Sequence, residues 1–383
     1  MKKTLAALAV LGAFAGSAAA ADVTLYGVVD QAFSYTYSDI KGHDGLKAKD
    51  GENTFEMASG INAGSRFGLK GKEDLGNGWS VGFKLENAVS TDDGTLGQNG
   101  RLFGREAALT VYGPFGELAF GRMGGIGSSC GTYDLLGYVD AFDGGDNAVW
   151  GFDASSRYDN MVTYATPRIA GLQAVAQYSF KTSTKGEDAT EQAKLDNQKE
   201  GRSTAERYAS FGLTGEYGPA QFAIGYELTK YSTLDRQTFK DKDDRQMVFV
   251  GGNYDLGVAK LFAEGQYFKG AEGAFDFDKM DAISKKGVKG YGLHLGTIVP
   301  VAAGELTVGA YYVDATVEAE GSAEDRDGSY YALAARYCYP LSTRTTVYVG
   351  GGYGEAKADA LSNEKEDAKA KIGNLYLGLT HTF

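Results

Sequence analysis

The residues best suited to chemistry are charged side chains gathered in one segment. Residues 123–156 carry five aspartates and neither lysine nor arginine: Asp134, Asp140, Asp143, Asp146 and Asp153. Carboxylates without a neighbouring nucleophile or base act on ions and dipolar solutes through their field. At 34 residues the segment is also far too long for a simple surface connection.

Catalysis needs a positioned base, and the chain has only three histidines. His43 lies in a polar stretch, His294 is far in sequence from any obvious partner, and His381 is two residues from the end. No catalytic constellation and no metal-ligand spacing emerges, although the acidic run 241–244 could bind Ca²⁺ weakly. We therefore expect no enzyme, no cofactor and no metal site.

The composition favours strands over helices. The chain has 383 residues with 55 Gly, 25 Tyr, 20 Phe and five Pro; Gly is poor in helix interiors, whereas aromatic residues favour strands. The lack of any apolar run of about 18 residues beyond the N-terminus excludes a bundle of membrane helices. A net charge of -12 argues against nucleic-acid binding.

The N-terminus predicts secretion. Residues 1–20 read as a bacterial signal peptide, with two lysines, an apolar stretch and a small-residue end, so the mature chain would be 21–383. Cys130 and Cys338 would then meet an oxidising compartment and could form one disulfide, but their spacing leaves pairing and two separate thiols equally open.

The mature chain consists of segments of roughly ten residues with period-2 alternation. Between 172 and 181 the even positions are apolar and the odd ones mostly polar, and 79–86 and 374–383 repeat the pattern with the parity reversed. This alternation predicts strands with one apolar and one polar face.

Short and long connectors also alternate along the chain. The short turns are at 74–78, 112–116, 167–171, 217–219, 254–257, 299–304 and 339–342, and the long polar stretches are at about 38–52, 91–100, 123–157, 182–205, 232–244, 270–287, 317–328 and 355–370. Fifteen connections predict sixteen antiparallel strands. An even strand number with short turns at one end and long loops at the other indicates an all-β transmembrane β-barrel.

A soluble β-sandwich is the alternative, since apolar and polar residues alternate along its strands too. It does not explain why connector length alternates, or why tyrosines stand beside the turns. Tyr112, Tyr217, Tyr254 and Tyr339 occupy such places, where a belt at the lipid headgroups would need amphipathic rings.

Six segments resemble the general porins of Gram-negative bacteria, of the neisserial and Burkholderia type. They are VTLYGVVD at 23–30, GSRFGLKGKEDLG at 64–76, FGELAFGR at 115–122, YATP at 164–167, PLSTRT at 340–345 and HTF at 381–383. The resemblance implies an outer-membrane channel for passive diffusion of ions and small hydrophilic solutes. It also implies a homotrimer in outer-membrane lipid, a constriction loop 123–156 folded into the lumen, and a C-terminal Phe383 read by the assembly machinery.

The resemblance further implies a ladder of basic residues on the wall opposite the acidic loop. Alternation places Arg66 and Lys70 on the face opposite Phe67, and it places Arg157 on the face of Asp159. We expect these residues in the lumen.

Two further ladder positions conflict with strict alternation. Counting from Leu109 puts Arg105 on the lipid side and Glu106 inside, and Arg122 has the same conflict. A β-bulge, or a position beyond the hydrocarbon edge, would return Arg105 to the lumen. For all four arginines the alternative is a surface or interfacial position.

Opposed charges across a water-filled gap would favour small hydrated solutes. The acidic loop favours a weak preference for cations, whereas arginines at the narrowest ring would favour anions. A substrate-specific channel, an adhesin and a barrel enzyme are the alternative functions, and the acidic loop could instead lie outside the barrel as a solvated lid.

Overall fold

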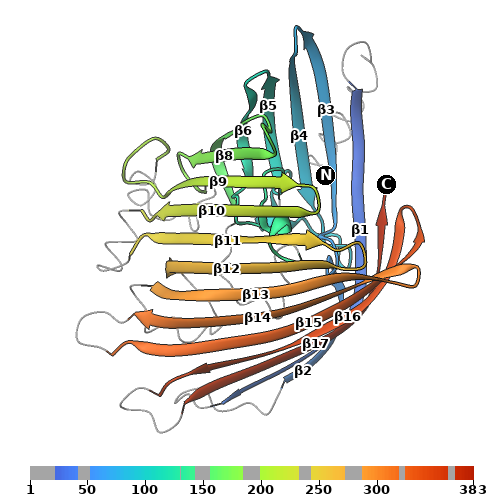
Figure 1. Cartoon of the computed structure of the whole chain (residues 1–383), viewed down its shortest axis with the longest axis vertical. Coiled ribbons are helices and arrows are strands. Elements are labelled where there is room, and N and C mark those ends of the chain that lie inside the picture. Colours follow the sequence, from blue (N-terminus) through green and yellow to red (C-terminus); the bar gives the residue numbers. More distant parts are fainter. Residues whose placement is uncertain are drawn as a thin grey trace.

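The computed structural model describes residues 22–41, 52–129, 131–142, 156–183, 199–232, 243–271, 287–318, 324–360 and 367–383. These residues form one continuous antiparallel sheet that curves into a barrel (Figure 1). The signal peptide predicted at 1–20 lies outside the described residues.

The sheet contains seventeen named strands. They are β1 (Asp22–Lys41), β2 (Glu52–Ser59), β3 (Arg66–Gly76), β4 (Trp79–Ala88), β5 (Glu106–Gly113), β6 (Gly116–Gly124), β7 (Arg157–Ala165), β8 (Leu172–Ser179), β9 (Arg207–Tyr217), β10 (Ala220–Lys230), β11 (Arg245–Asp255), β12 (Lys260–Ala271), β13 (Gly287–Val301), β14 (Gly304–Glu318), β15 (Arg326–Ser342), β16 (Thr345–Ala358) and β17 (Ala368–Thr382). Two short helical elements accompany them, α2 (Gly97–Gly100) and the 3-10 turn η1 (Leu136–Tyr138). No helix in the described ranges is long and apolar enough to cross a membrane.

The barrel closes between its first and last strands. β1 pairs with β17 along one edge. Along its other edge it pairs with β2 at Gln31 and Ser59 and with β3 at Val28 and Arg66. β2 and β3 therefore occupy one barrel position in succession, and the predicted sixteen-stranded antiparallel barrel is confirmed.

Connector length alternates as the sequence predicts. The turn between β3 and β4 shows why the short connections are tight, because Asn77 and Gly78 have φ of +52° and +79°. Left-handed backbone at both central residues matches the twist of a two-residue hairpin, and Asn-Gly adopts it readily.

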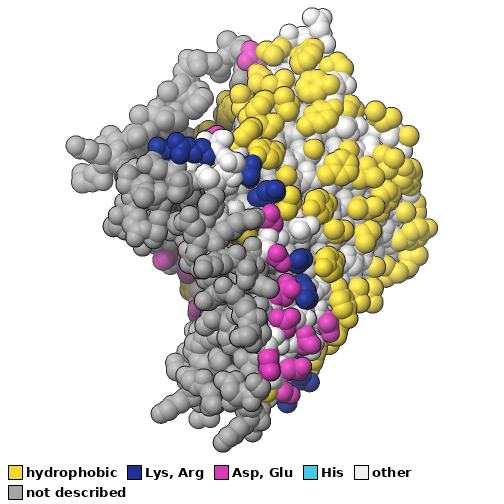
Figure 2. Space-filling model, turned by 90° about the vertical axis from the view of Figure 1, so that its left-hand side faces the viewer, with side chains coloured by type: hydrophobic (Ala, Val, Ile, Leu, Met, Phe, Trp, Pro, Cys, Tyr) yellow, Lys and Arg dark blue, Asp and Glu magenta, His cyan; other side chains and the backbone are white. Residues whose placement is uncertain are grey.

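The two faces of each strand differ in polarity. On β17, Leu375 and Leu377 are exposed on the outer face, whereas Asn374 and Tyr376 are buried on the inner face. Figure 2 shows the result as a broad hydrophobic surface bordered by charged side chains. Such a surface fits a lipid environment.

The tyrosines beside the turns do not all point outward. Tyr217, Tyr254 and Tyr339 are exposed. Tyr112 is different, because its Cα partner Ser80 lies on the inner face of β4, and Lys72 Nζ lies 3.9 Å from the centroid of its ring. The prediction of an interfacial ring is therefore wrong for Tyr112.

Candidate functional site

Glu86 on β4 is the centre of a first charged group on the inner face. Its carboxylate accepts a hydrogen bond from Tyr26 Oη at 2.9 Å and pairs with Arg105 Nε at 2.7 Å. Arg66 Nε and Lys84 Nζ lie 3.8 and 3.9 Å from the same carboxylate. Three strands and the loop before β5 thus direct polar atoms at one buried anion.

Arg105 reaches this group because it precedes β5 instead of belonging to it. β5 begins at Glu106, which alternation correctly places inside, since its side chain is buried. The Arg105 amide donates to the Glu86 carbonyl, and its guanidinium then turns to the Glu86 side chain. Strand parity does not apply to a residue outside the strand, which resolves the conflict found in the sequence.

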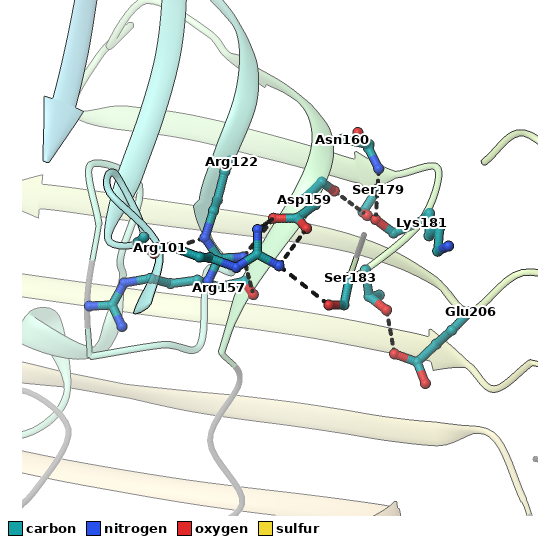
Figure 3. Close-up of polar contacts among 11 residues, drawn as sticks. Arg101, Arg122, Arg157, Asp159, Asn160, Ser179, Lys181, Ser183 and Glu206 are labelled. Atoms are coloured by element: carbon teal, nitrogen blue, oxygen red, sulfur yellow. Dashed lines mark hydrogen bonds and ion pairs between the residues drawn. The ribbon is translucent and has the colours of Figure 1, made fainter. Parts of the chain in front are cut away.

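Asp159 on β7 is the centre of a second charged group, shown in Figure 3. Arg122 Nη1 lies 2.7 Å from Asp159 Oδ1, and Arg101 Nη2 lies 3.0 Å from Asp159 Oδ2. Arg101 Nη2 is also 3.5 Å from Ser183 Oγ. One carboxylate therefore holds two guanidinium groups from different segments.

A β-bulge on β7 lies opposite Arg122. The pairing of β6 with β7 shifts between Gly121 and Met123. Gly121 has φ of +133°, and a Cβ there would lie 2.1 Å from the Ala107 carbonyl oxygen, so only glycine fits. On β7, Asn160 has φ of +51°. Arg122 itself pairs with Ala107 on β5 without a shift, so the irregularity lies on the facing strand β7 and not at Arg122.

The same bulge interrupts the alternation on which the placement of Arg157 rests. Arg157 is half-buried and paired with Gly124, and its carbonyl accepts a long hydrogen bond of 3.4 Å from Arg122. Lys70 Nζ lies 5.1 Å from the centroid of the Tyr26 ring. The roles of Arg157 and Lys70 in a constriction stay predictions.

We call these groups together the charged wall. It comprises Arg66, Lys84, Glu86, Arg101, Arg105, Glu106, Arg122 and Asp159. Its cations are more exposed than its carboxylates: Lys84 is 29% exposed, for example, and its partner Glu106 at 2.8 Å only 3%. The wall therefore presents more positive than negative charge to its surroundings.

Among its described residues, the segment 125–142 touches the charged wall through Thr132. Thr132 Oγ1 donates to Glu106 Oε1 at 2.6 Å, and Lys84 Nζ lies 3.4 Å from the same hydroxyl. This polar contact connects the acidic segment to β4 and β5.

The segment also contacts strands β9 to β14, which we call the anchor side. The Gly127 amide donates to Glu227 Oε1 at 3.0 Å, and Asn253 Nδ2 donates to the Tyr138 carbonyl at 2.8 Å. Apolar side chains of the segment are buried against Ala223, Met247 and Phe249, and these segment residues are Ile126, Leu135, Leu136 and Val139.

Asp140 and His294 form the innermost contact of the anchor side. Both side chains are 0% exposed, and Asp140 Oδ1 lies 3.3 Å from His294 Nε2. The Ala141 amide donates to the same Nε2, and Nδ1 lies 3.2 Å from the Ala310 carbonyl. A carbonyl can only accept, so Nδ1 carries the proton and Nε2 accepts, which makes the imidazole neutral.

This burial differs from the exposed loop charge that the sequence suggests for Asp140. Its carboxylate also accepts hydrogen bonds from the Phe142 amide at 2.7 Å and from Tyr311 Oη at 3.2 Å. Asp140 therefore lies beside His294, a neighbour that sequence separation concealed.

Asp134 lines a cavity of about 280 Å³, together with Gly131, Gly137, Tyr138 and Gln221. Its carboxylate accepts a hydrogen bond from the Leu136 amide at 2.8 Å, so it caps the start of η1.

Several predicted residues lie outside the described part of the chain, namely Cys130, Asp143, Asp146, Asp153 and His43. Pairing of Cys130 with Cys338 therefore stays a prediction; Cys338 Sγ is 3.8 Å from Asn62 Oδ1. Phe383 exchanges two backbone hydrogen bonds of 3.1 Å with Gly27, which fastens the C-terminus to β1. Within the described ranges no group of three or more metal-ligating side chains occurs.

Sequence reasoning missed the carboxylates of the charged wall. Lys84 and Glu86 stand on the polar face of the 79–86 alternation, so the signal was available. Arg101 lies in the loop between β4 and β5, where no periodicity applies, and its proximity to Asp159 follows from tertiary structure alone.

Comparisons of sequence identify relatives over the whole length. A family model described as Gram-negative porin matches residues 6–359. An outer membrane porin protein of Bordetella pertussis is 33% identical over 410 residues, with 100% of each chain covered. Outer membrane porin protein 32 of Delftia acidovorans is 30% identical over 270 residues, with 68% of each covered.

Solved structures share the fold at lower identity. An anion-selective porin from Comamonas acidovorans has a TM-score of 0.62 at 22% identity, with 95% of this chain and 100% of that chain covered. A trimer form of OmpT, an outer membrane protein of Vibrio cholerae, has a TM-score of 0.58 at 17% identity, with 95% and 100% covered.

Proposed function

We infer how the molecule works from the premise that this chain belongs to the Gram-negative porin family. It is an outer-membrane protein whose barrel forms a channel for passive diffusion of ions and small hydrophilic solutes. Such a channel discriminates between solutes by its width and by the charges at its narrowest ring.

The narrowest ring lies between the charged wall and the segment 123–156, folded into the lumen. What supports this is that the described residues of the segment bond to inner-face side chains on both sides, at Glu106 and at Glu227. A segment lying outside as a lid would not reach Glu227, whose neighbours Ile224 and Tyr226 are the exposed ones on β10.

The ring favours anions over cations. The charged wall has five basic and three acidic side chains, and the basic ones are the more exposed. Of the loop aspartates that suggested a cation preference, Asp140 is buried against His294 and Asp134 caps η1. The structurally similar porin from Comamonas acidovorans is described as anion-selective.

The channel assembles as a homotrimer after removal of residues 1–20. Support for the trimer comes from OmpT of Vibrio cholerae, a structurally similar protein that has a trimer form. We assign no catalysis to the His294 and Asp140 pair, because both side chains are wholly buried. Phe383, 47% exposed at the end of β17, is the candidate for recognition by the assembly machinery.

A planar-bilayer recording tests the proposal. Purified protein should produce discrete current steps, grouped in threes for a trimer, and a KCl gradient should give a zero-current potential of the sign that reports Cl⁻ selectivity. A potential of the opposite sign would show that the loop aspartates outside the described residues dominate the ring. Steps that never group in threes would overturn the trimer.

A further inference from the structure

A short stretch of the chain leaves the sheet between β2 and β3. Ser59, the last residue of β2, pairs with Gln31 on β1. Arg66, the first residue of β3, pairs with Val28 on the same strand. Only two β1 residues, 29 and 30, therefore stand opposite residues 60–65. Two residues of an extended strand cannot pair with six, so residues 60–65 project from the wall, and we call them the inner segment.

The inner segment projects into the lumen. Asn62 Nδ2 donates to Thr380 Oγ1 on β17 at 3.0 Å, and Cys338 Sγ on β15 lies 3.8 Å from Asn62 Oδ1. The Ile61 side chain packs against buried side chains of the inner face, namely Ala32, Tyr348 and Tyr376. The inner segment therefore covers part of the inner face of β15 to β17 and of β1.

Asp30 on β1 holds the inner segment in this place. The Gly60 amide and Ser65 Oγ both donate to the Asp30 carbonyl, at 3.1 and 3.0 Å. The Asp30 carboxylate accepts hydrogen bonds from the Asn62 amide at 3.3 Å and from Tyr348 Oη at 2.8 Å. Asp30 is 0% exposed. It therefore acts on the lumen only through the segment that it fixes.

Gly64 lies between two guanidinium groups of the charged wall. Its carbonyl accepts a hydrogen bond from Arg66 Nη1 at 2.9 Å. A Cβ at this position would lie 2.9 Å from Arg105 Nη1, which is too close for a real Cβ. Gly64 is not among the described glycines with a positive φ. Glycine is thus required here by the close approach of Arg105 and not by the backbone conformation.

Arg66 and Arg105 need fixed acceptors because they are like charges beside one carboxylate. Arg105 Nε lies 2.7 Å from Glu86, whereas Arg66 Nε lies 3.8 Å from the same carboxylate. One carboxylate cannot neutralise two guanidinium groups, and like charges at close range repel each other. The Gly64 carbonyl gives Arg66 its second acceptor. The two side chains are held 27% and 15% exposed, so both stay partly accessible to solutes.

The inner segment and the segment 125–142 flank the charged wall. The segment 125–142 lies on the inner face of β9 to β14, and the inner segment lies on that of β15 to β17 and of β1. The charged wall, on β3 to β7, lies between them around the barrel. The positions of its cations then decide which ion is favoured.

We propose that the inner segment positions the guanidinium groups of Arg66 and Arg105 for passing anions, with Asp30 and Gly64 as its positioning residues. The inner segment is thus a second determinant of ion selectivity, besides the segment 123–156. This inference rests on the proposed function, in which the charged wall sets selectivity.

Gly64→Ala tests the position of Arg105 without changing any charge. The new methyl group displaces only the end of a flexible side chain, so the barrel should fold as in wild type. In a planar bilayer under a KCl gradient, the ratio of Cl⁻ to K⁺ permeability should fall about twofold, the effect of moving one unit charge from about 4 to about 6 Å from an ion in water. Gly373→Ala on β17 is the matched control, because its Cβ would meet its nearest neighbours at 3.7 and 3.9 Å, and it should leave the ratio unchanged.

A double-mutant cycle shows whether the effect passes through Arg105. In an Arg105→Gln background, Gly64→Ala should leave the permeability ratio unchanged, because the group that it displaces is absent. An equal fall in both backgrounds, or an unchanged ratio in Gly64→Ala alone, would overturn the proposal.

Asp30→Asn tests the anchored end of the inner segment, and it keeps the proposal testable if Gly64→Ala does not fold. Through its field alone, the loss of a negative charge would raise the preference for Cl⁻. A loosened inner segment would instead take the carbonyl acceptor away from Arg66 and lower that preference. We expect the lower preference, and a higher one would overturn the positioning role of Asp30.

Failure of this inference and failure of the proposed function give different results. If wild type prefers K⁺, the proposed anion selectivity is wrong, whereas the inner segment still predicts that Gly64→Ala lowers the ratio of Cl⁻ to K⁺ permeability only when Arg105 is present. If wild type prefers Cl⁻ and Gly64→Ala has the same ratio, the inner segment has no part in selectivity and the proposed function stands.

Discussion

The segment 125–142 meets two sides of the barrel in different ways. On the anchor side it buries Ile126, Leu135, Leu136 and Val139 and the Asp140 carboxylate. On the charged wall it makes a polar contact through Thr132, among half-exposed cations. Burial of apolar surface contributes most of the stability of such contacts, whereas exposed charges contribute little. The anchor side thus holds the segment in place, and in the proposed function the charged wall acts on the solutes that pass.

Breaking the anchor side should give the largest effect. Leu135 is 4% exposed, and Leu135→Asp would place an unpaired carboxylate among apolar side chains, at a cost of several kcal/mol. We expect the segment to detach, so that single-channel conductance rises and the current becomes noisy. Leu256→Asp is the matched control, because Leu256 is 54% exposed at a turn. Unchanged conductance in Leu135→Asp would mean that the segment does not narrow the pore.

Removing the central anion of the charged wall should have the next largest effect. Glu86→Gln keeps the shape but deprives Arg66, Lys84 and Arg105 of a shared carboxylate. Loss of hydrogen bonds to charged groups costs about 1.5–3 kcal/mol, less the screening at these partly exposed cations. We expect lower resistance to urea and a zero-current potential moved further toward anions. Glu73→Gln, at an exposed position of β3, should change neither quantity.

Removing a cation from the charged wall should have a smaller effect. Arg122→Gln takes one positive charge from the group at Asp159, to which Arg101 remains bound. The anion preference should fall, with little change in stability, because the remaining guanidinium still pairs with the carboxylate. Arg344→Gln, in the exposed turn between β15 and β16, removes the same charge far from the wall. Equal shifts in the two variants would mean that net charge, and not the ring, sets selectivity.

The fold could be predicted from the sequence because a membrane barrel requires regular local patterns of residue type and connector length. Alternation identifies the faces, and connector length identifies the two ends. The exception is the position shared by β2 and β3, since an interruption within one strand resembles any other turn in the sequence. Tyr112 stands beside a turn, but period-2 counting along β5 places its ring on the inner face, so proximity to a turn does not predict the direction of a side chain.

The site could be predicted only in part because its geometry depends on irregularities and on long-range contacts. The bulge opposite Arg122 needs left-handed backbone at Asn160 and room for no side chain at Gly121, and neither is visible as a pattern. The contact of Asp140 with His294 depends on how the segment lies on β13. The sequence made Asp140 a candidate and gave His294 no obvious partner, and only the folded chain brings the two together.

The smallest predicted effect is a difference in the free energy of unfolding between substitutions of two adjacent tyrosines on β14. Tyr311 is buried and donates to Asp140 at 3.2 Å, whereas the exposed Tyr312 donates to Asp314 at 3.3 Å. Tyr311→Phe should lower the free energy of unfolding by about 1 kcal/mol, because a buried acceptor loses a donor. Tyr312→Phe should change it by less than about 0.5 kcal/mol, since the exposed carboxylate can bond to water instead. Urea titration of both variants measures the difference. Equal losses would mean that Asp140 keeps its charge satisfied without Tyr311, and that the apolar residues alone hold the segment to the anchor side.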